Sequence, residues 1–146
     1  MTTIAANHAR MVSDSQVTME GGNGDRVYQA QKIIRFKGDL IGCAGSNQQI
    51  EAFLAWYGTK KKKPQFPKDV DFEALILTSK GDLFAYDETL SRDKLVGDFY
   101  AIGSGGSAAL GALYAGASLE QAVTIATRID PYSGLPIQTL DLADNN

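Results

Sequence analysis

The sequence contains a single cysteine, Cys43, and a single histidine, His8. One cysteine cannot form an internal disulfide, and together these two side chains cannot supply the ligands of a zinc site. A basic surplus is also missing, because 14 Lys and Arg residues stand against 17 Asp and Glu residues, for a net charge of −3. Nucleic-acid-binding domains usually carry a basic surplus, so we expect no nucleic-acid partner.

Long apolar runs are missing as well. The chain has no stretch of about 18 apolar residues, and it does not open with a basic segment followed by an apolar core. We therefore expect no membrane partner, no secretory signal and a cytoplasmic location, which agrees with the reducing compartment suggested by the lone cysteine. With 146 residues, 44% hydrophobic and 21% charged, residues 1–146 have the size and composition of one folded domain.

Short extended segments separated by turn residues predict most of the strands. Hairpins are expected where such segments come in pairs, and single strands where they stand alone. The predicted pairs are 3–7 with 9–13, 32–36 with 40–45, and 73–79 with 82–87, and the single strands are 16–18, 99–102 and 137–142. The total is about nine strands.

Apolar residues at i, i+3, i+4 and i+7 from Ile50 predict an amphipathic helix, with Ser46 or Asn47 as its N-cap. Two further helices are expected over 107–115, which is rich in alanine and leucine, and over 118–129. The helices are gathered between hairpins and do not alternate with strands. This order indicates an α+β fold in which helices cover antiparallel sheets.

The first residues, Met1-Thr2-Thr3, suggest a chemistry. Removal of Met1 would give Thr2 a free α-amine, which titrates near pH ~8 in model peptides and can serve as the base for the threonine's own hydroxyl. A Met-Thr start is common, so this argument needs partners elsewhere in the chain. Polar residues that could be such partners lie at the ends of predicted elements: Asp14, Lys32, Ser104, Asp130 and Ser133.

Each of these features also has a simpler interpretation. Lys32 and Asp14 could form a surface ion pair, and Cys43 could be a small buried residue. The glycine-rich segment 103–106 could be a turn or a phosphate-binding loop, although it lacks the lysine of a P-loop. The lysine run 60–63 could be solvated surface.

Several motifs, taken in order, carry a resemblance to a known family. They are Thr2-Thr3-Ile4, Ser13-Asp14-Ser15-Gln16-Val17-Thr18, Lys32 at the start of a strand, Cys43-Ala44-Gly45 before a helix, Ala101-Ile102-Gly103-Ser104-Gly105-Gly106, and Asp130-Pro131-Tyr132-Ser133-Gly134. This set resembles the proteasome β-subunit family, including the bacterial ring peptidase that works with an AAA+ unfoldase. The resemblance implies an N-terminal-nucleophile (Ntn) hydrolase, a four-layer αββα sandwich of two antiparallel sheets covered by helices.

The resemblance also implies residue roles. Thr2 would be the nucleophile and its amine the base, Lys32 would favour the deprotonated hydroxyl, and Asp14 would hold Lys32. The Gly45 amide would bind the oxyanion, and Ser104, Asp130 and Ser133 would orient the amine and a water molecule. Thr18 and Asn47 would hold an extended substrate, while Ala30, Cys43 and Asn47 would line a pocket for the residue before the cut, with room for a medium or large apolar side chain. No metal and no cofactor are implied.

The sequence departs from the family pattern after the first helix. A basic loop over residues 58–72 stands where the family has a second long helix. The implied activity is a threonine peptidase acting on peptides or unfolded chains, with a homo-oligomeric ring as the assembly and an AAA+ unfoldase as a possible partner. Two alternatives remain: an amidase acting on small amides, and a non-catalytic shell or scaffold subunit.

Overall fold

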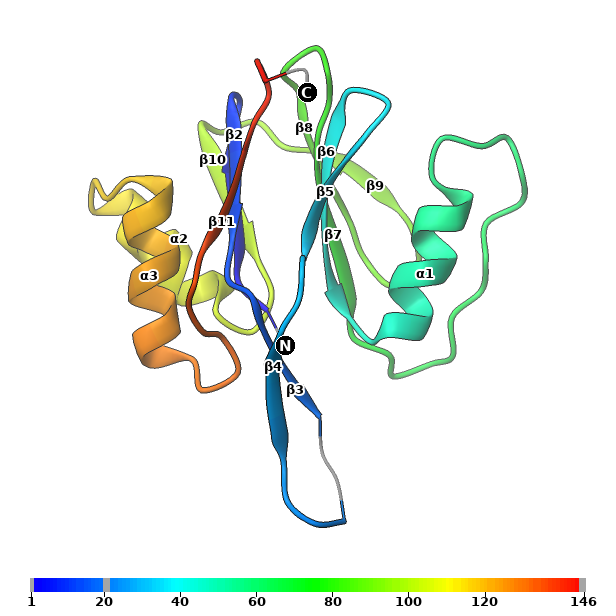
Figure 1. Cartoon of the computed structure of the whole chain (residues 1–146). Coiled ribbons are helices and arrows are strands. Elements are labelled where there is room, and N and C mark those ends of the chain that lie inside the picture. Colours follow the sequence, from blue (N-terminus) through cyan, green and yellow to red (C-terminus); the bar gives the residue numbers. More distant parts are fainter. Residues whose placement is uncertain (1, 20–21, 145–146) are drawn as a thin grey trace.

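Two antiparallel sheets stack face to face, with helices on their outer faces (Figure 1). The computed structural model describes residues 2–19 and 22–144. The predicted removal of Met1 lies outside these residues, as does part of the turn expected from Glu20 onward.

One sheet has the strand order β10-β1-β2-β11 and the other the order β5-β6-β7-β8-β9. The first comprises β10 (Phe99–Ile102), β1 (Ile4–Asn7), β2 (Arg10–Ser13) and β11 (Gln138–Asp141). The second comprises β5 (Ile33–Phe36), β6 (Asp39–Gly45), β7 (Phe72–Leu77), β8 (Leu83–Tyr86) and β9 (Arg92–Lys94). Strands β3 (Gln16–Met19) and β4 (Arg26–Gln29) form a separate two-stranded hairpin.

Strand β1 shows why the sheets stack in this way. Its side chains alternate between two faces, and both faces are buried. Ile4 and Ala6 belong to the cluster between the two sheets, whereas Ala5 packs with the helices on the other side. A strand apolar on both faces must be covered on both, so the molecule is the four-layer αββα sandwich of the α+β class that was expected.

The helices α2 (Gly106–Tyr114) and α3 (Leu119–Ile129) cover the first sheet, and α1 (Asn47–Trp56) covers the second (Figure 1). Helix α3 begins with a capping box, in which the Ser118 hydroxyl accepts from the Gln121 amide at 3.1 Å and the Gln121 side chain accepts from the Ser118 amide at 2.9 Å. Ser46 is the N-cap residue of α1, but its side chain makes no capping hydrogen bond. None of the described helices is long and apolar enough to span a bilayer.

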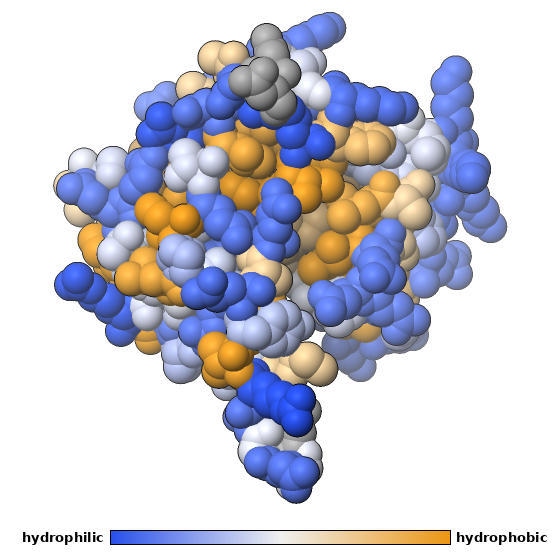
Figure 2. Space-filling model, viewed as in Figure 1, coloured by the Kyte–Doolittle hydropathy of each residue, from blue (hydrophilic) through white to orange (hydrophobic). Residues whose placement is uncertain are grey.

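Strands β4 and β9 were not anticipated, so the described chain has more strands than predicted. Every residue in both strands is exposed, and neither strand therefore has the alternating burial that marks a strand in a sequence. They form only because β3 and β8 offer unpaired edges. The β3–β4 hairpin projects from the body of the molecule, and its tip is predominantly polar (Figures 1 and 2).

Residues 58–71, between α1 and β7, form neither a helix nor a strand. Two contacts hold the segment against the body. The Trp56 indole donates to the Lys61 carbonyl at 3.0 Å, and the Phe66 ring packs edge-on against Phe72 at 5.2 Å. The lysines at 60–63 are exposed.

The imidazole of His8 connects two turns at the other end of the sandwich. Its Nδ1 lies 2.7 Å from the Gly81 carbonyl oxygen, and its Nε2 lies 2.6 Å from the Gly97 carbonyl oxygen. A carbonyl only accepts hydrogen bonds, so both bonds form together only when the ring is protonated. Backbone hydrogen bonding to Gly97 and then to Gly81 raises the pKa of His8 above its ordinary value.

This raised pKa predicts a pH-dependent stability. The folded state binds the proton more tightly than the unfolded state, so the stabilisation is complete below about pH 6.5 and is lost as the pH rises through the folded pKa. We expect the His8→Ala substitution to lower the urea midpoint more at about pH 5.5 than at about pH 8.5. Equal losses at the two pH values would contradict this assignment.

Candidate active site

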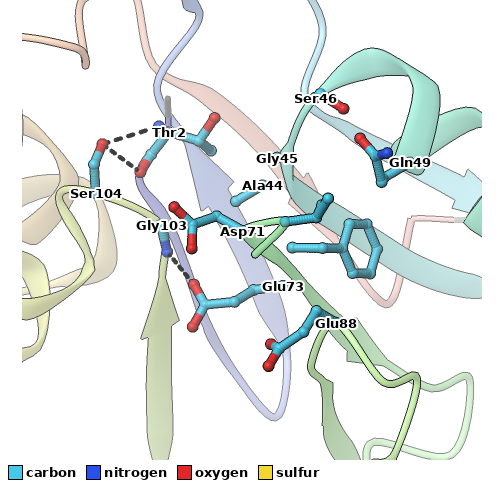
Figure 3. Close-up of a pocket in the computed structure, with 12 residues that line it drawn as sticks. Thr2, Ala44, Gly45, Ser46, Gln49, Asp71, Glu73, Glu88, Gly103 and Ser104 are labelled. Atoms are coloured by element: carbon cyan, nitrogen blue, oxygen red, sulfur yellow. Dashed lines mark hydrogen bonds between the residues drawn. The ribbon is translucent and has the colours of Figure 1, made fainter. Parts of the chain in front are cut away.

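Thr2 is buried directly before β1, next to the turn that joins β10 to α2. The Thr2 nitrogen donates to the Ser104 hydroxyl at 3.2 Å (Figure 3). The Gly105 amide donates to the Thr2 carbonyl at 3.2 Å. Gly103 has a φ of +93°, and a Cβ at this position would collide with the Thr2 carbonyl. The glycine-rich turn therefore lets two backbone segments approach closely enough to hold Thr2.

A chain of hydroxyl groups extends from the Thr2 nitrogen into the core. Ser104 and Ser133 each donate to Oδ2 of Asp130 at 2.6 Å. A serine hydroxyl has one hydrogen, so the Ser104 oxygen presents a lone pair to the Thr2 nitrogen. For the same reason Thr3, whose hydroxyl lies 2.7 Å from that of Ser133, is the donor in that pair.

The carboxylate of Asp130 is the acceptor on which this chain converges. Burial acts to raise its pKa, but hydrogen bonds from Ser104, Ser133 and the Tyr132 amide act together in the opposite direction, and the pKa is lowered overall. Asp130 is thus held as an anion, which keeps the Ser104 lone pair directed at the Thr2 nitrogen.

A buried ion pair lies on the other side of the Thr2–Thr3 peptide. Lys32 Nζ lies 2.9 and 3.0 Å from the two carboxylate oxygens of Asp14, and the side chains are only 7% and 0% exposed. Asp14 also accepts from the backbone amides of Thr3 at 3.0 Å, Gln16 at 3.1 Å and Gly134 at 3.0 Å. The alternative of a surface ion pair is therefore wrong.

The surroundings of Lys32 place its ammonium group where its charge can act on the Thr2 side chain. Burial lowers the pKa of Lys32, while the charge and hydrogen bond of Asp14 act in the opposite direction. Oδ1 of Asp14 accepts from both Lys32 Nζ and the Thr3 amide, which brings the ammonium beside the Thr2–Thr3 peptide. A positive charge there would favour the deprotonated form of a nearby hydroxyl.

Thr2 opens onto a cavity of about 700 Å³. Gly45, at the end of β6, shares the lining of this cavity with Thr2 (Figure 3). Gly45 has a φ of +144°, and an added Cβ would lie 2.8 Å from the Asp71 carbonyl oxygen, so only glycine fits. The other lining residues are Ala44, Ser46, Gln49, Val70, Asp71, Phe72, Glu73, Glu88, Gly103 and Ser104.

Comparison with solved structures identifies proteins that share this fold. BPH from Thiobacillus denitrificans is 22% identical with a TM-score of 0.67, and the alignment covers 99% of both chains. HslV from Trypanosoma brucei is 21% identical with a TM-score of 0.70, over 95% of this chain and 99% of that one. The Anbu (Gly-1) mutant from Hyphomicrobium sp. strain MC1 is 13% identical with a TM-score of 0.70, over 97% of this chain and 81% of that one.

The fold is that of the proteasome β-type Ntn hydrolases. No protein-family model matches the sequence, and no curated protein does either. The likeness to these structures therefore concerns the fold, and the chemistry of this chain has to be argued from its own residues.

Within this Ntn-hydrolase fold, the structure brings all seven predicted catalytic positions into one region. Thr2, Ser104, Asp130 and Ser133 are linked by the hydroxyl chain. Asp14 and Lys32 join them through Thr3, and Gly45 joins them across the cavity.

The four predicted substrate-binding residues do not line the cavity beside Thr2. Thr18 lies in β3, Ala30 lies between β4 and β5, and Asn47 is the exposed first residue of α1. Cys43 is 5% exposed and packs in the cluster beneath α1, because alternate β6 side chains face opposite ways. The predicted pocket for the residue before the cut is therefore not this cavity, and its existence elsewhere on the molecule stays a prediction.

Cys43 has no features of a nucleophile. Burial raises the pKa of its thiol to about 12, so the thiolate is not formed at neutral pH. The simpler interpretation, a small buried residue, fits this position.

The structure also answers the suggestion of a phosphate-binding loop. The Gly103 amide donates to the Glu73 carboxylate at 2.9 Å, and the Gly105 and Gly106 amides donate to the carbonyls of Thr2 and Gly103. These amides are occupied within the protein, and one of them already binds a carboxylate. The turn does not form an anion cradle.

Some residues of the site were not singled out from the sequence. Thr3 completes the hydroxyl chain, and its only signal was the Thr-Thr doublet. Gln138, from β11, accepts from the Lys32 amide at 3.0 Å and donates to the Ala30 carbonyl at 2.8 Å, which fixes the backbone around Lys32. No sequence pattern marked Gln138, because its partners are more than 100 residues away.

Proposed function

We propose that the protein is an N-terminal threonine peptidase that hydrolyses peptide bonds through an acyl-enzyme at Thr2, after removal of Met1. One observation carries the proposal: the Thr2 nitrogen lies 3.2 Å from the hydroxyl oxygen of Ser104, which Asp130 holds in place. An acceptor so directed would orient a free amine for proton transfer. The carboxylate behind this acceptor, Asp130, is buried, so the protein fixes the direction of the acceptor from within.

The proposed reaction follows from these roles. The Thr2 amine takes the hydroxyl proton while Oγ attacks the substrate carbonyl carbon, and the Gly45 amide would stabilise the oxyanion. The amine then passes the proton to the leaving nitrogen, the C–N bond breaks, and an ester remains on Oγ. A water molecule, giving its proton to the amine, attacks the ester and releases the acid, and the proton returns to Oγ.

Lys32 and Asp14 would support the first step. The ammonium beside the Thr2–Thr3 peptide would lower the proton affinity of the Thr2 hydroxyl, and Asp14 would keep Lys32 charged and in place despite its burial. No metal or cofactor enters this scheme.

We extend the proposal to the assembly. The fold shared with Trypanosoma brucei HslV and the family motifs support a self-compartmentalising homo-oligomeric ring in the cytoplasm, acting on peptides or unfolded chains. An AAA+ unfoldase is a possible partner. In this chain the exposed basic segment 58–71 would take the place of the family's second helix in such contacts.

Intact-mass spectrometry and epoxomicin labelling test the proposal. An epoxyketone reacts with both the hydroxyl and the free amine of an N-terminal threonine, and Thiobacillus denitrificans BPH has been solved in complex with epoxomicin. We expect protein from the native host to lack one methionine and to gain one epoxomicin adduct. As a control, an alanine inserted between Met1 and Thr2 should prevent the adduct without disturbing the fold.

The opposite result is equally clear. A chain that retains Met1 in its native host and takes up no epoxomicin would reject the peptidase and the amidase together. It would leave the non-catalytic subunit as the remaining interpretation.

A further inference from the structure

The cavity beside Thr2 is charged with one sign only. Its lining contains three carboxylates, Asp71, Glu73 and Glu88, and no lysine, arginine or histidine (Figure 3). Among the residues that the structure describes, no basic side chain forms an ion pair with any of the three. The cavity therefore has a negative field that the protein does not neutralise there.

These carboxylates do not form a metal site. In the described ranges, 2–19 and 22–144, no group of three or more His, Cys, Asp or Glu side chains converges as metal ligands do. Glu73 is instead anchored by the Gly103 amide at 2.9 Å, so its charge is held at the cavity wall.

Gln49 gives an independent indication of a ligand. Gln49 is 7% exposed and lines the cavity. Its side-chain amide points toward Ser46 and Gly45 (Figure 3). This amide has no hydrogen-bond partner within the described part of the chain. The amide is accessible from the cavity and no protein group among the described residues pairs with it, so it can form a hydrogen bond with a ligand group that reaches Gln49.

The remaining wall of the cavity is apolar. Ala44, Val70 and Phe72 line it beside the carboxylates. An apolar wall next to negative charge suits a lysine or arginine side chain, which has an aliphatic stem and a cationic end.

The chemistry indicates on which side of the scissile bond this cavity lies. In the proposed reaction the Thr2 amine delivers its proton to the leaving nitrogen, so the leaving group must lie near that amine. The Thr2 nitrogen is held by Ser104, and Ser104 lines the cavity. The residues predicted to hold the acyl side, Thr18, Ala30, Cys43 and Asn47, are all absent from its lining.

We propose that this cavity binds a cationic side chain, lysine or arginine, on the leaving-group side of the cleaved bond. The inference rests on the proposed function for its place in the reaction, but the charge selectivity of the cavity can be tested without turnover. Asp71 and Glu88 attract the cationic end, and the Gln49 carbonyl accepts a hydrogen bond from it.

The first experiment measures cleavage of internally quenched peptides that differ only in the residue after the cut. Arginine and lysine should give kcat/KM roughly tenfold or more above norleucine, which has a similar stem without the charge, and glutamate should be the poorest. The preference should shrink as sodium chloride rises from about 50 mM to about 500 mM. Equal rates for arginine and norleucine would overturn the proposal.

Variants of carboxylates inside and outside the cavity test whether the preference for a cationic residue arises in this cavity. The double substitution Asp71→Asn with Glu88→Gln should remove most of the preference for arginine over norleucine, measured as the ratio of the two kcat/KM values. Glu51→Gln, on the exposed surface of α1 and outside the cavity, removes a carboxylate and should leave the preference unchanged. A preference that survives the double substitution would place the cation elsewhere and reject this cavity.

A binding measurement separates this proposal from the peptidase proposal. Arginine amide resembles a released product, and its binding should shift the Gln49 side-chain amide signals in an NMR spectrum of the intact protein, whereas norleucine amide should bind roughly tenfold more weakly. Arginine amide binding without any peptide cleavage would reject the peptidase and keep the cation site. Peptide cleavage without a charge preference and without this NMR shift would keep the peptidase and reject the cation site.

Discussion

Replacing Thr2 by alanine is expected to lower peptide hydrolysis by roughly 10³-fold or more and to abolish epoxomicin labelling. The substitution removes the hydroxyl oxygen on which the proposed acyl-enzyme forms. It leaves the backbone contacts of residue 2 with Ser104 and Gly105 intact, so the fold should not change. Turnover of a quenched peptide and thermal unfolding should be measured on the same preparation.

Two controls make the result specific. Thr2→Ser keeps a hydroxyl at the same position and should retain measurable turnover. Thr139→Ala, at an exposed position of β11, removes a threonine hydroxyl outside the lining of the cavity and should behave as wild type. Hydrolysis that persists in the Thr2→Ala protein would reject Thr2 as the nucleophile.

Asp14 and Lys32 are expected to respond unequally to substitution. Asp14→Ala leaves the buried Lys32 ammonium and the amides of Thr3, Gln16 and Gly134 without their acceptor. The loss of one partner of a buried ion pair typically costs about 3–5 kcal/mol. We expect a loss of unfolding free energy in that range, together with loss of hydrolysis.

Lys32→Met should separate activity from stability. Methionine keeps an apolar stem of similar length, and Asp14 retains its three backbone amide donors, so the loss of unfolding free energy should be smaller than for Asp14→Ala. Hydrolysis should still fall by roughly 10²-fold or more, because the charge near the nucleophile is gone. Urea denaturation and kcat/KM, measured on both variants, check the two effects; equal destabilisation with retained activity would contradict the assigned role.

Local patterns made much of the fold predictable. The hairpins, the helix beginning at Ser118 and the helix around Ile50 depend on interactions between residues a few positions apart, and the structure contains all of them. Strands β4 and β9 escaped prediction because they are exposed on both faces and exist only through pairing with a neighbour.

The predicted catalytic residues came from ordered motifs, and their mutual geometry came from the structure. The sequence placed Ser104 in a glycine-rich turn and Asp130 after a helix, but nothing in their spacing required both to converge with Ser133 on one hydroxyl chain. The pairing of β1 with β10 brings that turn against Thr2. Burial of Lys32 and Asp14 likewise follows from the stacking of the sheets and not from either residue type.

By itself, the sequence determined the α+β class, the absence of a disulfide and the presence of a threonine that could become N-terminal. Only the tertiary structure decided the charge of the cavity beside Thr2. Gln49 comes from α1, Asp71 and Glu73 from the entry to β7, and Glu88 from the segment after β8. Secondary structure depends on neighbours along the chain, whereas a cavity is formed by segments that meet only when the sheets and helices pack together.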